Sequence, residues 1–454
     1  MTKSTPRSLM KRGTADVTAL RPGSPTMSPR KRIRIIHPFY RKNAGTHLKK
    51  NLLKKLFLIS ALFFLAIEAQ ARLSPLAPKP VWSALDGFQQ TMTKADFVAL
   101  LDRVYVPGGA WKDSISLTND AAIIETSSDK PSYVLKFAPD AASVRHAPVY
   151  WRPRRALPAF EPGKPLAGLK IAIDPGHLGG IWAKMEERWF QMGNSTPVTE
   201  GDMTLKVAKL LVPRLTALGA EVFLTRTKPS PVTSARPTQL RAAAAESLQQ
   251  KNDRVTKESV TKESERLFYR VSEIRRRGRI VNEAIKPDLV LCLHFNAEAW
   301  GDEKHPHLVN DNHLHFLVTG AWSKEELSYE DQRFDMLVKL LNRSCSEELP
   351  LANAMSDVMA KATGLPPYVY RGGSVVRVND NPYLWARNLL ANRLFTCPVV
   401  YVEPYVMNSR SGFARIQAGD YNGRQTFGGV SRQSIYREYA DAITAGLVKY
   451  YSKR

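Results

Sequence analysis

The sequence predicts an α/β protein, in which a three-layer αβα domain with a mostly parallel sheet is preceded by a small α+β domain. Three observations support this prediction. Apolar strand-like runs alternate with amphipathic helical patterns over residues 166–454. The segment before them has one helical pattern followed by three strand-like runs. At 454 residues, the chain is also too long for one ordinary domain.

The first 71 residues are expected to lie outside the folded domains. They hold 15 of the 66 lysines and arginines and 2 of the 42 acidic residues, so the remainder has 51 basic and 40 acidic residues and a net charge of +11. Four lysines precede the apolar run 56–67, and an A-x-A sequence follows it at 69–71, as in a secretory signal peptide. We therefore predict a signal peptide at 49–71 and a secreted or periplasmic protein of the cell envelope.

Two further expectations concern this region. The apolar run is about a dozen residues, short of the roughly 20 that span a bilayer, so we expect cleavage, and membrane contact only if the segment stays uncleaved. Residues 1–48 are predicted to be a disordered basic extension, consistent with a start codon assigned too far upstream. The moderate charge of the remainder, without a nucleic-acid motif, argues against nucleic acid as a partner.

Residues 72–140 are predicted to form the small α+β domain. Thr93 has the position of an N-cap for a helix whose Phe97, Leu101 and Val104 share one face. Turn-forming residues then separate strand-like runs at 114–117, 121–126 and 133–137. The segment has no chemical motif, which leaves it a spacer or substrate-binding module. Residues 141–165 are rich in Pro and Arg and are predicted to be a linker.

The catalytic domain is predicted at 166–454. Strands are expected at 169–174, 221–225, 288–295, 314–318 and 398–403, and helices at 202–218, 265–285, 334–341, 352–362 and 433–450. This alternation implies a sheet covered on both faces, with its chemistry beyond the carboxyl ends of the strands. Residues 229–264 are polar and longer than a usual connection, and we interpret them as a helical insertion that could cover the cleft and regulate access.

Four polar residues fall where such a sheet places its functional groups. His177, His294 and Glu403 end apolar strand-like runs, and Glu200 directly precedes an amphipathic helix. Taken singly, a histidine at a strand end is often only hydrogen-bonded at the surface, and a glutamate is favourable near any helix N-terminus. Two histidines and a carboxylate, with a position left for water, form a known catalytic zinc set, and a further carboxylate could carry the proton. The joint pattern favours a metal site.

The motifs around these residues resemble the zinc-dependent N-acetylmuramoyl-L-alanine amidases of the amidase-3 family. The family has a strand with D-P-G-H, matched by residues 173–180, a ligand Glu at a helix start, matched by 199–205, and a strand ending in L-T-R, matched by 222–226. It then has an R-x-x-x-x-N helix, matched by 277–282, an H-x-N-A strand end, matched by 294–297, and a late strand with the catalytic Glu, matched by 402–408. The resemblance covers 169–451, and nothing comparable covers 72–160.

The resemblance implies a Zn²⁺ ion held by His177, Glu200 and His294, with Glu403 as the catalytic carboxylate. It implies a peptidoglycan hydrolase that uses a zinc-activated water to cleave the amide bond between N-acetylmuramic acid and the L-alanine of the stem peptide. Peptidoglycan is then the main partner, and the identity of any activator protein is left open. Two alternatives stay open as well: a non-catalytic wall-binding protein on the same fold, and a zinc peptidase acting within the stem peptide.

The sequence also departs from the pattern of the family. Gly201 follows the ligand glutamate where many members have Lys, and the long spacer before Glu200 contains Glu186 and Glu187, which are rival ligands. We prefer Glu200 because the helix and strand that follow it fit the pattern of the family. A histidine-rich stretch could suggest another metal site, but a solvent-facing or groove-lining role is expected for its alternating residues; its histidines are His305, His307, His313 and His315.

Overall fold

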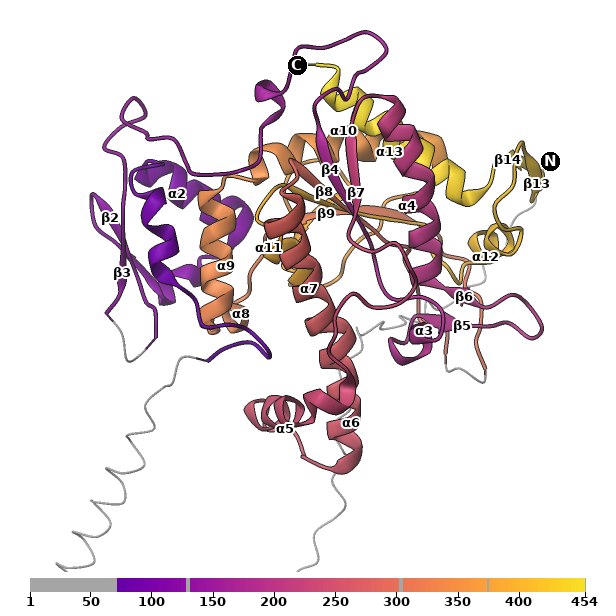
Figure 1. Cartoon of the computed structure of the whole chain (residues 1–454), viewed down its shortest axis with the longest axis horizontal. Helices are drawn as coiled ribbons and strands as arrows, with labels where there is room; N and C mark the ends of the chain where they lie inside the picture. The colour runs from indigo at the N-terminus through magenta and orange to yellow at the C-terminus, as the bar shows by residue number, and fades with distance from the viewer. Residues whose placement is uncertain (1–71, 128–130, 302–304, 374, 454) are drawn as a thin grey trace, which may run out of the picture. The chain divides into compact units, whose positions relative to one another are not determined.

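A computed structural model describes residues 72–127, 131–301, 305–373 and 375–453 (Figure 1). The extension and signal peptide predicted at 1–48 and 49–71 lie outside the described residues. Among the residues described, no helix combines the length and the apolar character needed to cross a membrane.

The centre of the described structure is a seven-stranded sheet with the order β10-β11-β9-β12-β8-β4-β7. In chain order, the strands are β4 (Lys170–Pro175), β7 (Glu221–Leu224), β8 (Leu289–Leu293), β9 (Leu314–Thr319), β10 (Val375–Arg377), β11 (Leu384–Arg387) and β12 (Val399–Pro404). Four neighbouring pairs are parallel, whereas β10–β11 and β9–β12 are antiparallel. The mostly parallel sheet is confirmed, although the sequence did not predict β10 and β11. Because β9 runs against β12, its first residues lie at the rim where β12, β8 and β4 end.

Helices cover both faces of the sheet and give the three predicted layers (Figure 1). One face packs against α4 (Glu200–Ala217), α10 (Cys345–Thr363) and α13 (Ile435–Tyr451). The other packs against η7 (Ile280–Ile285), which continues α7 (Glu273–Arg279), and α11 (Leu390–Leu394). The strands are buried on both faces because their apolar residues are continuous, and each buried Leu, Ile or Val contributes about 1.5–3 kcal/mol of transfer free energy.

The helix predicted at 265–285 begins earlier, at Lys257, and runs to Ile285 as α6 (Lys257–Arg266), η6 (Leu267–Ser272), α7 and η7. Thr256 caps it by accepting a hydrogen bond from the Ser259 amide. Segment η6 is a π-helical turn, a feature that occurs often at functional sites. Helix α5 (Arg241–Gln250) packs against α6, and η5 (Pro237–Leu240) leads into it, so helices occupy much of 229–264.

The segment before the sheet folds as η1 (Trp82–Phe88), α2 (Lys94–Leu100), η2 (Leu101–Tyr105), η3 (Ala110–Asp113) and the antiparallel strands β1 (Ile115–Leu117), β2 (Ala121–Ile124) and β3 (Tyr133–Lys136). Thr93 accepts a hydrogen bond from the Asp96 amide, as predicted for its N-cap. The segment shares one hydrophobic core with α8 (Lys324–Leu327) and α9 (Glu330–Leu341). Trp82 Nε1 also donates to Glu330 Oε1 at 2.8 Å.

The remaining elements are short. They are η4 (Arg154–Ala156), α3 (Trp182–Met185), β5 (Trp189–Phe190), β6 (Val198–Thr199), α12 (Arg410–Gln417), β13 (Gln425–Phe427) and β14 (Val430–Arg432). Within the stretch 141–165, Trp151 is buried and Arg152 pairs with Asp288 at 2.7 Å. Through these two residues, this stretch contacts the sheet layer.

Candidate functional site

His177 lies in the turn that follows β4. Its φ angle is +58°, a left-handed conformation that is uncommon for a side chain with a Cβ atom and is often found at functional sites. Gly176, just before it, faces the ring of His294: a Cβ atom at Gly176 would lie 2.3 Å from His294 Cε1. The turn therefore brings two imidazoles together, and their ring centroids are 4.9 Å apart.

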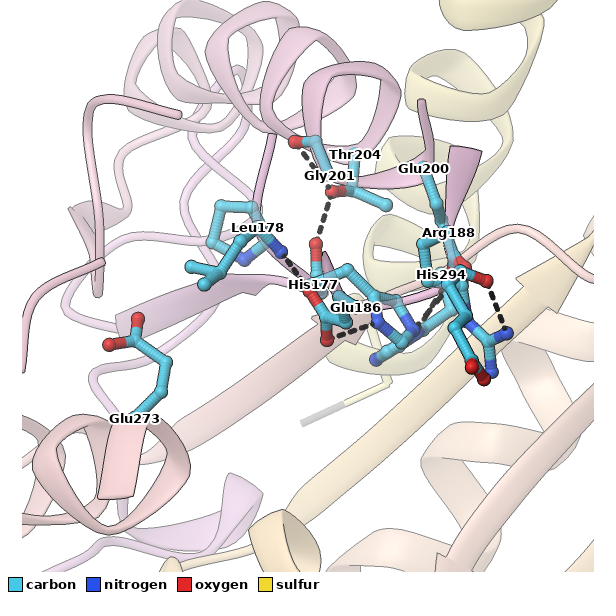
Figure 2. Close-up of polar contacts among 12 residues, drawn as sticks. His177, Leu178, Glu186, Arg188, Glu200, Gly201, Thr204, Glu273 and His294 are labelled. Atoms are coloured by element: carbon cyan, nitrogen blue, oxygen red, sulfur yellow. Dashed lines mark hydrogen bonds and ion pairs between the residues drawn. The ribbon is translucent and has the colours of Figure 1, made fainter. Parts of the chain in front are cut away.

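Glu200 is the first residue of α4 and is 2% exposed. Its Oε1 accepts a hydrogen bond from the Phe295 amide at 3.1 Å and lies 3.2 Å from His294 Nδ1. Its Oε2 lies 3.3 Å from His177 Nε2 (Figure 2). One ligand atom from each of His177, Glu200 and His294 lies within 4.8 Å of the others, so the structure brings together the three residues that the sequence singled out as ligands.

Burial and mutual charge set the pKa values of these three residues. Burial lowers the pKa of His177 well below its usual range. Burial raises the pKa of Glu200, but His177, His294 and Arg188 outweigh it and leave the pKa below its usual value. Burial lowers the pKa of His294, but the hydrogen bond and charge of Glu200 raise it above the usual value. Metal ligation requires an ionised carboxylate and neutral imidazoles. The directions for Glu200 and His177 match this requirement, whereas His294 has to give up its proton when a metal binds.

Glu186, one of the rival ligands, lies against the other nitrogen of His177. Its Oε1 is 2.7 Å from His177 Nδ1, and its Oε2 accepts a hydrogen bond from the Leu178 amide at 2.6 Å (Figure 2). Burial raises the pKa of Glu186. Because Glu186 contacts Nδ1 of His177, the Nε2 atom of the same ring is directed at Glu200. A carboxylate against the second ring nitrogen is usual for a histidine that binds a metal. Glu187 lines the same cavity but is not part of the group of three.

Two buried arginines brace the turn that carries His177. Arg226, at the L-T-R strand end, donates to the carbonyl oxygens of Pro175 (3.1 Å), Gly176 (3.1 Å) and Gly201 (2.6 Å). It thereby joins the turn after β4 to the first turn of α4, and burial lowers its pKa to about 9. Arg277, from the R-x-x-x-x-N helix, donates to the carbonyl oxygens of Pro175 (2.8 Å) and His177 (3.1 Å). In the sequence, both arginines are recognisable only as matches to motifs of the amidase-3 family, and their contacts with the turn depend on the fold.

The structure also accounts for the departure from the family pattern at Gly201. A Cβ atom there would lie 2.2 Å from both the carbonyl carbon and the carbonyl oxygen of Leu178. The first turn of α4 therefore packs directly on the backbone that follows His177. Only glycine fits this contact without a shift of the backbone.

Glu403 lies in β12, next to β8, the strand that His294 directly follows. The His294 amide donates to the Val402 carbonyl oxygen at 3.0 Å, so the two strands are in register at this point. The side chain of Glu403 is 19% exposed, and its Oε2 lies 3.2 Å from His315 Nε2. Burial raises the pKa of Glu403, but His315, its hydrogen bond, His294 and Arg387 outweigh burial and hold the pKa at about 2.

All four predicted site residues, with His315, line one cavity of about 430 Å³. Residues of the helix that runs from Lys257 to Ile285 also line this cavity, Tyr269 and Arg270 among them. Residues 229–264, all of which are described, contribute none of its lining. The expectation of a solvent-facing role is wrong for His313 and His315, which are 6% and 1% exposed, because Tyr368 packs against both rings. The groove-lining alternative holds for His315.

No protein-family model and no curated protein matches the chain. The chain is similar to solved structures of N-acetylmuramyl-L-alanine amidases from Mycobacterium abscessus (18% identity, TM-score 0.34, 63% of this chain and 99% of that chain) and Mycobacterium smegmatis (16%, 0.34, 64% and 99%). It is also similar to the CwlD amidase from Clostridioides difficile, solved in complex with the GerS lipoprotein (15%, 0.33, 63% and 100%). Each of these proteins is matched over nearly its whole length, and the rest of this chain lies outside the match.

Proposed function

We propose that this protein is a zinc-dependent peptidoglycan hydrolase that cleaves the amide bond between N-acetylmuramic acid and the L-alanine of the stem peptide. The observation that carries the proposal is the meeting of His177, Glu200 and His294 within 4.8 Å, in one cavity with Glu403. The motifs that resemble the amidase-3 family surround these residues and support the same activity.

The donor set fits a zinc ion. Two imidazoles and one carboxylate are a known set of three protein ligands for catalytic zinc, and a fourth position is left for water. Glu200 is a buried carboxylate that faces both histidines, and Glu186 holds His177 from behind. A zinc ion bound by His177, Glu200 and His294 would lower the pKa of a water molecule and polarise the carbonyl of the substrate amide.

The remaining step is proton transfer, and we assign it to Glu403. In this proposal, its carboxylate accepts a proton from the attacking water and returns that proton to the leaving nitrogen of L-alanine. A pKa of about 2 keeps the Glu403 carboxylate ionised near neutral pH. The products are a lactyl carboxylate on the sugar and a stem peptide with a free amino terminus. This mechanism requires the scissile amide to lie between the donor set and Glu403.

The proposed substrate is found in the cell envelope, and the signal peptide predicted at 49–71 would deliver the protein there. The moderately basic remainder of the chain suits an acidic wall polymer. The proposal leaves open whether an activator protein binds this enzyme and which protein that is.

The test is digestion of purified peptidoglycan, followed by mass analysis of the soluble products. The wild type should release intact stem peptides that begin with a free L-alanine, and Glu403→Ala should release none. The matched control is Glu258→Ala, because Glu258 is 80% exposed and forms an ion pair with Lys262 at the surface. This control should digest as the wild type does.

Two results would contradict the proposal. Cleavage inside the stem peptide would identify a zinc peptidase instead. Binding of the wild type to peptidoglycan without release of any product would favour the non-catalytic wall-binding alternative.

A further inference from the structure

His315 lies directly opposite Glu403 in the antiparallel pair of β9 and β12. Side chains at such opposite positions have Cβ atoms about 4.5–5.5 Å apart and share one face of the sheet. The imidazole is 1% exposed, and its Nε2 lies 3.2 Å from Glu403 Oε2. The contact is therefore fixed by strand register and shielded from solvent.

Asn296 determines which nitrogen of His315 carries the proton. Asn296 Oδ1 accepts a hydrogen bond from the Ala297 amide at 2.7 Å, so its Nδ2 group faces the histidines. That Nδ2 lies 3.3 Å from His315 Nδ1. An amide NH₂ group can only donate, so Nδ1 must be the acceptor and the proton of the neutral ring must be on Nε2.

The Nε2–H group of this tautomer has two acceptors within reach. Glu403 Oε2 lies 3.2 Å from Nε2, and the hydroxyl oxygen of Tyr370, at 2.8 Å, is the closer partner. An ionised carboxylate can only accept, so the contact between His315 and Glu403 is a hydrogen bond only when Nε2 holds the proton. Asn296 thus acts on Glu403 through His315.

We propose that His315 is a positioning residue for Glu403: held by Asn296 with a proton on Nε2, it donates to Oε2 and orients the carboxylate toward the cavity. The inference rests on the proposed function, because Glu403 is the proton carrier only in that reaction. Nothing in this role requires His315 to touch the substrate or the metal.

His313, which lies just before β9 and two residues from His315, provides a matched control. It is also a buried histidine packed against Tyr368, and its Nδ1 lies 3.4 Å from the same Asn296 Nδ2 group. Its Nε2, however, lies 3.0 Å from Glu298 and not against Glu403, and it does not line the cavity. A general loss of packing would affect variants of either histidine, whereas loss of the donor to Glu403 would affect only His315.

The kinetic test compares His315→Leu, His315→Gln and His313→Gln on peptidoglycan fragments. His315→Leu removes the donor, and kcat should fall about 10-fold to 100-fold, while KM changes less than about 2-fold. His315→Gln retains a neutral N–H donor and should recover kcat to within about 5-fold of the wild type. His313→Gln should stay within about 2-fold. Zinc content and thermal midpoint, measured on each variant, should match those of the wild type.

A second measurement does not depend on activity. ¹⁵N-histidine labelling, with the His315→Gln spectrum used for assignment, reports which ring nitrogen of His315 carries the proton. An Nε2–H signal supports the proposal, whereas an Nδ1–H signal, or unchanged kcat in His315→Leu, overturns it. If the wild type releases no stem peptide, the proposed function fails, and the ¹⁵N spectrum still decides whether His315 can donate to Glu403.

Discussion

Buried cations brace the metal half of the candidate site, which consists of His177, Glu200 and His294. In the carboxylate half, which consists of Glu403 and His315, neutral side chains contact the imidazole instead. In the metal half, Arg226 and Arg277 donate to backbone carbonyl oxygens on both sides of His177. In the carboxylate half, the contacts to His315 come from Asn296 and Tyr370.

The difference follows from where each residue lies along its element. His177 is in a turn and Glu200 begins a helix, where backbone groups lack regular partners, so long charged side chains must fix the backbone itself. Glu403 and His315 lie within paired strands, where the ladder already fixes the backbone and only the direction of the carboxylate is left to set. Each of the following predictions tests one side of this comparison.

Arg277→Met should have the largest effect on stability, because Asp174 and Glu273 would stay buried without their cation. Breaking a buried pair in this way costs about 3–5 kcal/mol of unfolding free energy. Arg214→Met is the control, since Arg214 pairs with Asp441 at a partly exposed position and should lose at most about 1 kcal/mol. Urea denaturation of both variants measures the difference, and equal losses would show that the arginine is not a brace.

Gly201→Ala tests the contact between α4 and the backbone after His177. A Cβ atom 2.2 Å from Leu178 forces a shift, so we expect a loss of about 1–3 kcal/mol and weaker zinc binding. In Gly278→Ala the new Cβ would lie 3.4 Å from the nearest atom, Leu394 Cβ, within a helix, and stability should be unchanged or slightly higher. Thermal unfolding and zinc titration of both variants provide the measurement.

Glu186→Gln should weaken zinc binding about 10-fold to 100-fold, because the glutamine replaces the carboxylate that holds His177 Nδ1. Glu187→Gln should bind zinc as the wild type does. Competition with a chromophoric chelator measures both affinities. If Glu187→Gln loses the metal, Glu187 is a ligand and the assignment of Glu200 is wrong.

The carboxylate half should give the smallest effect, which depends on pH. Glu403 has a pKa of about 2 in the folded protein, below the ordinary value of 4.5 for a glutamate, so its ionisation stabilises the fold above about pH 4.5. That contribution is lost as the pH falls through about 2. Because the side chain is 19% exposed, we expect about 1 kcal/mol. The gap in unfolding free energy between the wild type and Glu403→Gln should narrow from pH 5 to pH 2, and a constant gap would contradict the prediction.

The metal half could be predicted from the sequence to a large extent. Asp174-Pro175-Gly176-His177 ends one apolar run, His294 ends another and Glu200 precedes an amphipathic helix, so local pattern alone places all three at one rim of a parallel sheet. The spacing of residues along the chain did not decide which of Glu186, Glu187 and Glu200 is the carboxylate ligand. That choice depends on which carboxylate faces both imidazoles and which lies behind His177.

In the carboxylate half, only Glu403 could be predicted from the sequence. His315 is near the start of its strand, and the assumption of a mostly parallel sheet places strand starts at the rim opposite the site. β9 is antiparallel to β12, and this reversal brings His315 opposite Glu403. Periodicity along the chain determines which residues form strands and which of them are buried. Strand direction and neighbours depend on long-range packing, so only the tertiary structure decided that a buried histidine faces the proposed catalytic carboxylate.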